Sequence, residues 1–461
     1  MAGLKLEHSD QLALWRQLTS IGSWHVGVRP GATDVTAGRP LVVDLFAGAG
    51  GLSLGFEQAG YDVVAAVELD PIHSAVHEFN FPYSTTFCRN ATTVTGDEIR
   101  SYSALGSREL HAVVGGAPCQ GFSLIGKRAL DDPRNALLCE FARIVLELQP
   151  RYFVLENVAG LTVGDHRKLL DEVIEVFEQG GYKVLTPYKV LQAAEFGTPQ
   201  SRRRLFLLGA RHDVPLPSYP DPTHVARKVR GDPPVASILP RSPSVWEAIG
   251  DLPEADAYPE LLEGDSVLAK FDEPSVYAAA LRGLVRSPLD LSRSRPFDEK
   301  LLTSSARTVH TTRSIERFAA TPPGRTEAVS RFLRLHPDGV SNTLRAGTAS
   351  DRGAHTSPRP IHPTAPRVIT VREASRLHGY PDWFRFHITK WHGFRQIGNS
   401  VPPPLAKAVA IRLLRADGVK PQLGPEVEPG DVGLLGLTAS EAERHFGIHE
   451  RVIPLRTRRA G

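Results

Sequence analysis

A cysteine stands in the glycine-rich stretch GGAPCQGFS, where a thiol could serve as a nucleophile. Cys119 follows Pro118, and the preceding apolar run HAVVGG predicts a buried strand that ends at this turn. A thiol at the carboxyl end of a strand is well placed to meet a ligand, whereas a structural cysteine usually lies among apolar side chains. Position alone therefore allows either a nucleophile or a buried bystander.

Three further polar motifs could carry chemistry, although each has a plain structural interpretation when taken alone. In ENV, Glu156 follows the apolar run YFVL, and a poorly solvated carboxylate holds a proton or requires a partner. In QSRRR, Arg202 and Arg204 stand two residues apart before an apolar run, so strand geometry would turn both to one side. QIGNSVPPP, residues 396–404, reads as a tight polar turn before a helix. The structural alternatives are a loop carboxylate, a solvated basic edge and a helix cap.

The stretch DLFAGAGG follows an apolar run and opens a helix, an arrangement that suits a cofactor. Small residues let the backbone approach a ligand, and a helix N-terminus favours a negative group. Gly48 and Gly50 fit the dinucleotide fingerprint GxGxxG, but Ser53 occupies its third glycine position. Glu68 follows about twenty residues later, where a carboxylate can accept both hydroxyls of a ribose. The pattern fits NAD or S-adenosylmethionine, and a turn without a ligand remains an alternative.

Alternating apolar runs and amphipathic stretches position these motifs. The predicted strands are residues 41–46, 62–68, 111–116, 152–158, 182–191 and 203–210, and the predicted helices are 51–60, 135–148 and 166–181. Continuously apolar strands alternating with helices are typical of a parallel sheet covered on both faces. The fold class is therefore α/β.

Changes in composition suggest the domain organisation. Residues 1–39 form an N-terminal extension, and 40–211 carry the α/β pattern. Residues 212–366 are rich in proline and arginine, which predicts a separate, loop-dominated domain. Regular patterning returns at 367–416, with helices predicted from Val371 to His378 and from Pro404. Residues 417–461 form a linker and tail with a capping box from Thr438 to Glu441.

Composition narrows the class of protein. No apolar run approaches the roughly 20 residues of a membrane span, and the N-terminus lacks the layout of a signal peptide, so we expect a cytoplasmic protein. Three cysteines without a CxxC pair argue against a zinc site, and we expect no metal. A net charge of +3 does not by itself indicate a nucleic-acid partner.

The motifs DLFAGAGG, VEL, GGAPCQGFS, ENV, QSRRR, REASRLHGYPD and QIGNSVPPP, in this order, resemble the C5-cytosine DNA methyltransferase family of bacterial type II modification enzymes. The resemblance covers nearly all of residues 41–411, and the variable stretch falls where the family keeps its target-recognition domain. It implies a class I S-adenosylmethionine-dependent methyltransferase sheet, Rossmann-like, with a second, smaller, loop-rich domain. Double-stranded DNA would lie between the two.

The chemistry of this family gives each polar motif a role. Carbon 5 of cytosine is a poor nucleophile until a thiolate adds to carbon 6, and we assign that attack to Cys119. A protonated Glu156 would offset charge at N3 of the ring. The resemblance gives Arg204 the cytosine O2 and Arg202 the nucleotide and its phosphates. Asn157 would support the site, and Gln200 would lie beside it at the DNA.

The resemblance also implies the cofactor site for S-adenosyl-L-methionine. Phe46 would contact the adenine, the Gly48–Gly51 turn the methionine end, and Glu68 the ribose. Its implied contacts are Phe46, Gly48, Gly50, Gly51, Leu52, Glu68, Leu69, Asn90, Pro118, Asn399 and Ser400. There is one departure, because RNA at residues 89–91 replaces the GDI of many members, which leaves Asn90 in place of an aspartate at the adenine.

A carbon inside a stacked duplex is out of reach, so the target base must be flipped out. The resemblance makes LIGKRALDDPRN, residues 124–135, a mobile catalytic loop with Lys127 and Arg134 as phosphate contacts. Arg293, Arg295, Arg313 and Arg345 are candidates for base-edge contacts in the major groove. We expect a monomer, with a cognate restriction endonuclease as a possible partner.

Three other functions fit parts of the sequence. A tRNA methyltransferase of the same chemistry would have a shorter variable region and a CFT tripeptide, and this chain has neither. An NAD-dependent oxidoreductase would explain the glycine-rich turn but not PCQ, ENV and QxRxR together. A catalytically inactive DNA-binding protein would have no need of both the thiol and the acid.

Overall fold

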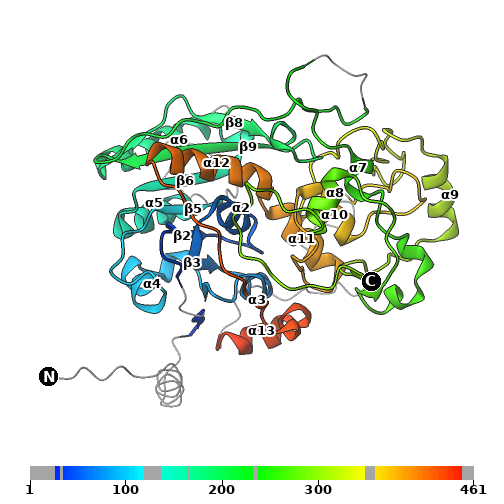
Figure 1. Cartoon of the computed structure of the whole chain (residues 1–461), viewed down its shortest axis with the longest axis horizontal. Helices are drawn as coiled ribbons and strands as arrows, with labels where there is room; N and C mark the ends of the chain where they lie inside the picture. The colour runs from blue at the N-terminus through cyan, green and yellow to red at the C-terminus, as the bar shows by residue number, and fades with distance from the viewer. Residues whose placement is uncertain are drawn as a thin grey trace.

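The apolar runs pair into a nine-stranded sheet in the computed structural model, which describes residues 26–31, 35–118, 136–162, 166–231, 237–347 and 359–448 (Figure 1). The strands are β1 Val28–Arg29, β2 Leu41–Leu45, β3 Asp62–Glu68, β4 Thr85–Cys88, β5 Ala112–Gly115, β6 Tyr152–Val158, β7 Tyr182–Val184, β8 Lys189–Gln192 and β9 Arg203–Arg211. Their order is β1-β4-β3-β2-β5-β6-β9-β7, with β8 also paired to β9. The α/β prediction is confirmed.

The expectation of a parallel sheet is correct for its centre and wrong for its edges. Strands β4, β3, β2, β5 and β6 run parallel, but β9 is antiparallel to β6, β7 and β8, and β1 is antiparallel to β4. The reason lies in the connections between the strands. Strand β8 follows β7 after a short loop, and β9 follows β8 without the helical crossover that a parallel pair needs. Strands that return without a crossover pair antiparallel.

Helices cover both faces of the sheet. Helices α2 Gly51–Ala59, α3 Pro71–Asn80 and α12 Pro403–Ala416 share one apolar core with it, and α4 Gly96–Tyr102, α5 Ala136–Leu148 and α6 His166–Gln179 share the other. The apolar stripe of α5, formed by Leu138, Phe141, Val145 and Leu148, is buried. Short 3₁₀ turns lie at η1 Ala91–Thr93, η4 Ala159–Thr162 and η5 Ala193–Phe196. Helices α3 and α4 and strands β1 and β4 were not predicted, and the single strand predicted over 182–191 is two strands, β7 and β8.

The second half of the chain forms a lobe of short elements beside the sheet (Figure 1). We use second lobe for its described residues 237–347 and 359–366. Its elements are α7 Val245–Ile249, η6 Ala255–Ala257, η7 Pro259–Leu262, β10 Val267–Leu268, α8 Val276–Leu281, β11 Leu301–Leu302 and α9 Thr312–Ala320. Helices α10 Val371–His378 and α11 Lys390–Asn399 then lead back to α12 at the sheet. The bounds of α10 are those predicted, α12 begins one residue earlier than predicted, and α11 was not predicted.

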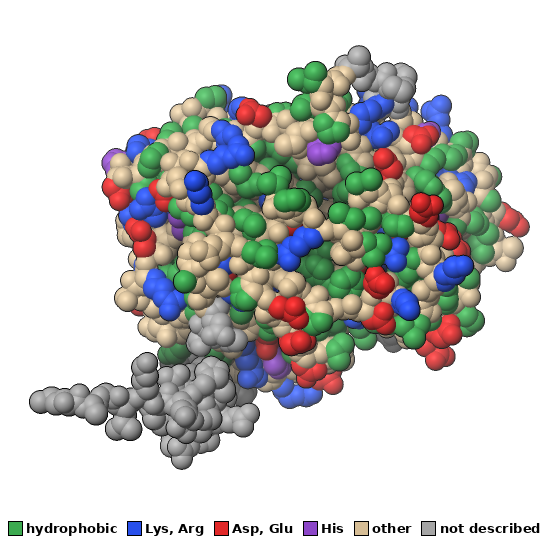
Figure 2. Space-filling model, in the orientation of Figure 1, with side chains coloured by type: hydrophobic (Ala, Val, Ile, Leu, Met, Phe, Trp, Pro, Cys, Tyr) green, Lys and Arg blue, Asp and Glu red, His purple; other side chains and the backbone are tan. Residues whose placement is uncertain are grey.

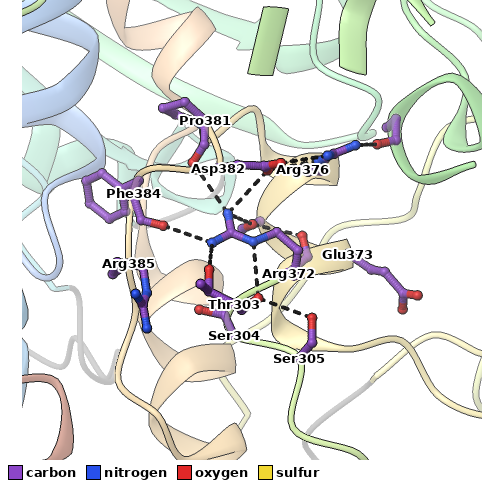
Figure 3. Close-up of polar contacts among 12 residues, drawn as sticks. Thr303, Ser304, Ser305, Arg372, Glu373, Arg376, Pro381, Asp382, Phe384 and Arg385 are labelled. Atoms are coloured by element: carbon purple, nitrogen blue, oxygen red, sulfur yellow. Dashed lines mark hydrogen bonds and ion pairs between the residues drawn. The ribbon is translucent and has the colours of Figure 1, made fainter. Parts of the chain in front are cut away.

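Arg372, a buried arginine on α10, forms hydrogen bonds to segments that come before and after α10 in the sequence (Figure 3). The Arg372 guanidinium donates to the carbonyl of Thr303, 3.3 Å away, and to that of Phe384, 3.2 Å away. Arg376, one turn later, forms a two-pronged ion pair with Asp382 and a further bond to Asp251. The second lobe and the loop before α11 are therefore held to a single helix.

Two arginines that were candidates for base contacts instead anchor the second lobe to the sheet. Arg295 is 6% exposed and pairs with Glu57 of α2 through both carboxylate oxygens at 2.7 Å. Arg293 is 3% exposed and lies 3.2 Å from Asp62 of β3. Both predictions are therefore wrong, because burial against carboxylates uses the donors that a base would need.

The end of the described chain packs back on α3. The capping box from Thr438 to Glu441 is present and begins α13 Ala439–His445, which follows the turn η10 Val432–Gly436. His445 meets Glu78 of α3 at 2.8 Å. Cationic and anionic side chains are interspersed over the face in Figure 2, so charge alone marks no binding surface there. Within the part of the chain that the structure describes, no helix is long and apolar enough to span a bilayer.

The Glu57–Arg295 pair gives a prediction for stability. Glu57→Gln leaves a buried guanidinium without its counter-charge, and we expect the free energy of unfolding to fall by about 3–5 kcal/mol. Arg313→Met, at an exposed arginine of the second lobe, is the matched control and should change it by less than ~0.5 kcal/mol. Urea denaturation measures both, and a loss below ~1 kcal/mol for Glu57→Gln would show that the pair is not an anchor.

Candidate active site at the carboxyl ends of the strands

The predicted site residues come together around one cavity of about 740 Å³. The carboxyl ends of β2, β3, β5 and β6 meet along one edge of the sheet, which is where ligands bind in open α/β folds. The predicted residues that line the cavity are Phe46, Gly48, Gly51, Leu52, Glu68, Leu69, Asn90, Pro118, Glu156, Arg204, Asn399 and Ser400. Asn157, expected to support the site, also lines it.

The turn between β2 and α2 carries backbone strain at the cavity wall. Phe46 has a φ of 58°, a left-handed conformation that a bulky residue rarely adopts, and such strain is concentrated at functional sites. A Cβ at Gly51 would lie 2.5 Å from the Val401 carbonyl oxygen, so only glycine fits there. Gly50, with a φ of 104°, begins α2, and its Cβ would meet Phe81 at 2.4 Å. Gly50 shapes the turn and is not among the residues that line the cavity, so its contact with the cofactor stays a prediction.

Glu68 is fixed by backbone donors on both sides. Its Oε2 accepts a hydrogen bond from the Gly48 amide at 2.9 Å, and its Oε1 accepts one from the Asp70 amide at 2.8 Å. A carboxylate oxygen has two lone pairs, so each oxygen can accept a further donor from the cavity. The geometry suits a ligand with two adjacent hydroxyl groups.

Asn90 and Leu69 lie where the cavity opens to solvent. Leu69 is 38% exposed, and Asn90 follows β4 as an exposed residue. The Asn90 Oδ1 already accepts from the Thr92 amide at 3.1 Å and so caps η1. One lone pair of this oxygen remains for a donor in the cavity.

Glu156 and Arg204 form an ion pair inside the cavity. Arg204 Nε lies 2.8 Å from Glu156 Oε1, and the glutamate is 7% exposed. Burial raises the pKa of Glu156, while the charges of Arg204 and Arg202 lower it, and the net shift is upward. A Cβ at Gly116 would lie 2.8 Å from Glu156 Oε2, so the carboxyl group depends on glycine at this position. Asn157 Nδ2 donates to the Ala117 carbonyl at 3.0 Å and thereby holds the backbone before Pro118.

Arg202 and Gln200 do not reach the cavity. Arg202 is 1% exposed and donates to the carbonyls of Leu344, Gly398 and Ser400 at 2.7–2.8 Å. Gln200 is fully buried and contacts His378 and Leu344. Both side chains are buried away from the cavity, and the two Nη atoms of Arg202 are used inside the protein, so the expected contacts of Arg202 with phosphates and of Gln200 with DNA stay predictions without support from this geometry.

Cys119, Lys127 and Arg134 lie outside the described residues, which resume at residue 136 after Pro118. Of the described cysteines, Cys88 is a buried free thiol. Burial raises the pKa of Cys88, so that thiol stays protonated and unreactive. Among the described residues, no group of three His, Cys, Asp or Glu is placed to hold a metal ion.

Sequence reasoning missed four charged or polar residues of the cavity wall, Asp70, His73, Arg89 and Arg395. Asp70 caps α3 by accepting from the Ile72 amide at 3.0 Å, and the dipeptide Asp70–Pro71 is a helix-start signal that could have revealed it. Arg395 stands on α11, whose polar sequence gives no sign of which face is turned inward.

The comparisons with known proteins agree on one family. The family model for C-5 cytosine-specific DNA methylase matches residues 41–415. The chain is 58% identical over 421 residues to the type II methyltransferase M.XorII of Xanthomonas oryzae pv. oryzae, covering 91% of this chain and 95% of that one. It is 33% identical to the type II methyltransferase M1.HphI of Haemophilus parahaemolyticus, covering 81% and 86%. A crystal structure of an E. coli prophage protein assigned as a DNA modification methyltransferase aligns with a TM-score of 0.64 at 31% identity, covering 82% and 99%.

A buried acid on β2 gives a prediction on pH. Burial raises the pKa of Asp44 to about 7, against the hydrogen bonds that its carboxylate accepts from Ser53. An acid with a raised folded-state pKa contributes stability at low pH that is lost as the pH rises through about 7. Relative to Asp44→Asn, the wild type should lose about 2–3 kcal/mol of unfolding free energy between about pH 5 and about pH 8. Urea denaturation at the two pH values tests this, and parallel profiles would contradict it.

Proposed function

Because the chain belongs to the C-5 cytosine-specific DNA methylase family, we propose that it transfers a methyl group from S-adenosyl-L-methionine to carbon 5 of a cytosine flipped out of duplex DNA. One observation carries the proposal. A single cavity joins a turn suited to a nucleoside cofactor with a buried acid–arginine pair suited to a pyrimidine.

The residues of the β2–α2 turn fit this cofactor. Glu68, with both oxygens held by backbone amides, would accept the ribose hydroxyls, and the ring of Phe46 would lie against the adenine. The backbone at Gly48 and Gly51 leaves room for the methionine end, with Leu52, Pro118, Asn399 and Ser400 beside it. Leu69 and Asn90 would complete the adenine end. S-adenosyl-L-methionine, when bound, supplies an electrophilic methyl group.

Glu156 and Arg204 would hold the cytosine. The raised pKa of Glu156 favours the protonated acid, which can donate from Oε2 to N3 as charge develops on the ring. Arg204 has several N–H donors, so it can keep Glu156 in place through Nε and donate to O2 of the base through another nitrogen. The same pair would therefore position the base and stabilise the charge that develops on it.

Cys119, the residue after Pro118, would supply the nucleophile. Its thiolate would form a bond to carbon 6, and the electrons of the C5–C6 double bond would make carbon 5 nucleophilic. Carbon 5 would then take the methyl group, while the cofactor sulfur keeps the electron pair of the broken bond and leaves as S-adenosylhomocysteine. Water removes the proton from carbon 5, and those electrons restore the double bond while the carbon–sulfur bond breaks. The thiolate is then free for another turnover.

Residues 212–366, which include the second lobe, are the candidate target-recognition domain, with residues 40–211 and 367–416 as the catalytic domain. Arg313 and Arg345 are exposed on it and remain candidates for base contacts. Lys127 and Arg134 remain candidates for phosphate contacts. The similarity to type II methyltransferases supports a modification enzyme of a restriction–modification system, acting as a monomer in the bacterial cytoplasm beside a cognate endonuclease.

Bisulfite sequencing tests the proposal directly. DNA from a host that expresses the protein should contain protected cytosines in one short sequence, and the same host with Cys119→Ala should contain none. Cys119→Ala should still bind S-adenosylhomocysteine, because the cofactor walls are unchanged. Protection that persists in Cys119→Ala would reject the assigned nucleophile, and no protection with the wild type would reject the activity.

The acid can be tested separately. Glu156→Gln keeps the shape of the side chain but has no acidic proton, and we expect kcat to fall by about 10²–10⁴-fold. Its affinity for S-adenosylhomocysteine, measured by calorimetry, should stay within about twofold of the wild type because the cofactor contacts are retained. A kcat close to that of the wild type would show that Glu156 does not act as the acid.

A further inference from the structure

A chain of hydrogen bonds links the second lobe to the cofactor side of the cavity. The Leu344 amide donates to Gln200 Oε1 at 3.1 Å, and Gln200 Nε2 lies 2.9 Å from His378 Nδ1. His378 Nε2 in turn lies 3.1 Å from the Ser400 carbonyl oxygen. Leu344 belongs to the second lobe, and Ser400 lines the cavity.

The direction of these bonds defines the state of His378. A backbone amide only donates, so Gln200 Oε1 is the acceptor and Gln200 Nε2 is the donor. His378 Nδ1 must then accept, and Nε2 must carry the hydrogen that points to Ser400. Such a ring is neutral, in agreement with burial and the charge of Arg202, which place the pKa of His378 well below its usual value.

Arg202 provides a second link between Leu344 and Ser400. Its Nη1 donates to the Leu344 carbonyl at 2.8 Å, and its Nη2 donates to the Ser400 carbonyl at 2.7 Å. The two segments are therefore connected by a neutral path and by a charged path, both fully buried.

The segments on either side of these hydrogen bonds are closely packed. A Cβ at Gly398 would lie 2.2 Å from the amide nitrogen of Ala346, so this part of the second lobe rests directly on the end of α11. A Cβ at Gly51 would lie 2.8 Å from Cβ of Ser400, so the Ser400 turn rests directly on the cofactor turn. Both contacts are too close to admit a side chain at the glycine.

We propose that His378, with Gln200 and Arg202, couples occupation of the cofactor cavity to the position of residues 341–347 of the second lobe. This inference rests on the proposed function, because it takes Ser400 as a cofactor contact. His378 lines no part of the cavity, and it is a positioning residue. Since the exposed Arg345 lies within this segment, cofactor binding would order a surface available to DNA.

Hydrogen exchange followed by mass spectrometry tests the coupling on the full chain. Adding S-adenosylhomocysteine to the wild type should slow amide exchange in residues 341–347, although this segment contributes nothing to the cavity wall. This measurement needs no variant, no DNA and no turnover.

Two substitutions of His378 separate its two bonds. Asn has an oxygen that can accept from Gln200, as Nδ1 does, but it is too short to reach Ser400, whereas Gln has an amide that reaches as far as Nε2. His378→Asn should therefore lose the slowing in 341–347 and bind S-adenosylhomocysteine about three- to tenfold more weakly, and His378→Gln should recover most of both. His362→Asn is the matched control, a buried histidine of the second lobe that contacts Thr364 and Glu373, and it should behave as the wild type.

The outcomes distinguish the two proposals. If the wild type does not bind S-adenosylhomocysteine, the proposed function fails and the coupling fails with it. If the wild type binds it and exchange in residues 341–347 is unchanged, the coupling alone is overturned. The same holds if a folded His378→Asn matches the wild type in both measurements, or if His362→Asn loses as much as His378→Asn.

Discussion

The antiparallel register between β6 and β9 is the constraint on which the rest of the site depends. Val158 pairs with Arg204 and Glu156 pairs with Phe206, so Glu156 and Arg204 are diagonal neighbours on one face of the sheet. A parallel β9 would begin at the opposite edge and leave Arg204 at the far end of β6. The strand that departs from the parallel pattern is therefore the one that brings the arginine to the acid.

Two opposing effects set the protonation state of Glu156. Burial favours the neutral acid, and two arginines favour the carboxylate, with burial the larger effect. The balance depends on Gly116, because a side chain there would displace the carboxyl group from its buried position. A glycine whose sequence context suggests only a flexible turn thus helps to determine whether a proton is available in the cavity.

The sequence was sufficient to predict those elements whose pattern does not depend on distant parts of the chain. Strands β3 and β6 match their apolar runs, and α10 has the bounds predicted for it, Val371 to His378. The direction of β9 could not be predicted, because strand pairing depends on partners distant in the sequence. The arginines of QSRRR show the same limit for the site. Strand spacing predicts that Arg202 and Arg204 point to one side, but Arg202 precedes β9 and is buried, whereas Arg204 lies within β9 and lines the cavity.

The separate positions of Arg202 and Arg204 also explain why one motif needs both. Carbonyl oxygens carry no net charge, so the guanidinium of Arg202 is hydrogen-bonded without being neutralised, and its field acts on Glu156 from inside the protein. Arg204, at the cavity, has a carboxyl partner. If Arg202 were replaced by a neutral residue, the pKa of Glu156 would rise further and the Ser400 turn would lose a brace at the same time. The electrostatics of the acid and the shape of the cofactor side are therefore joined through one buried charge.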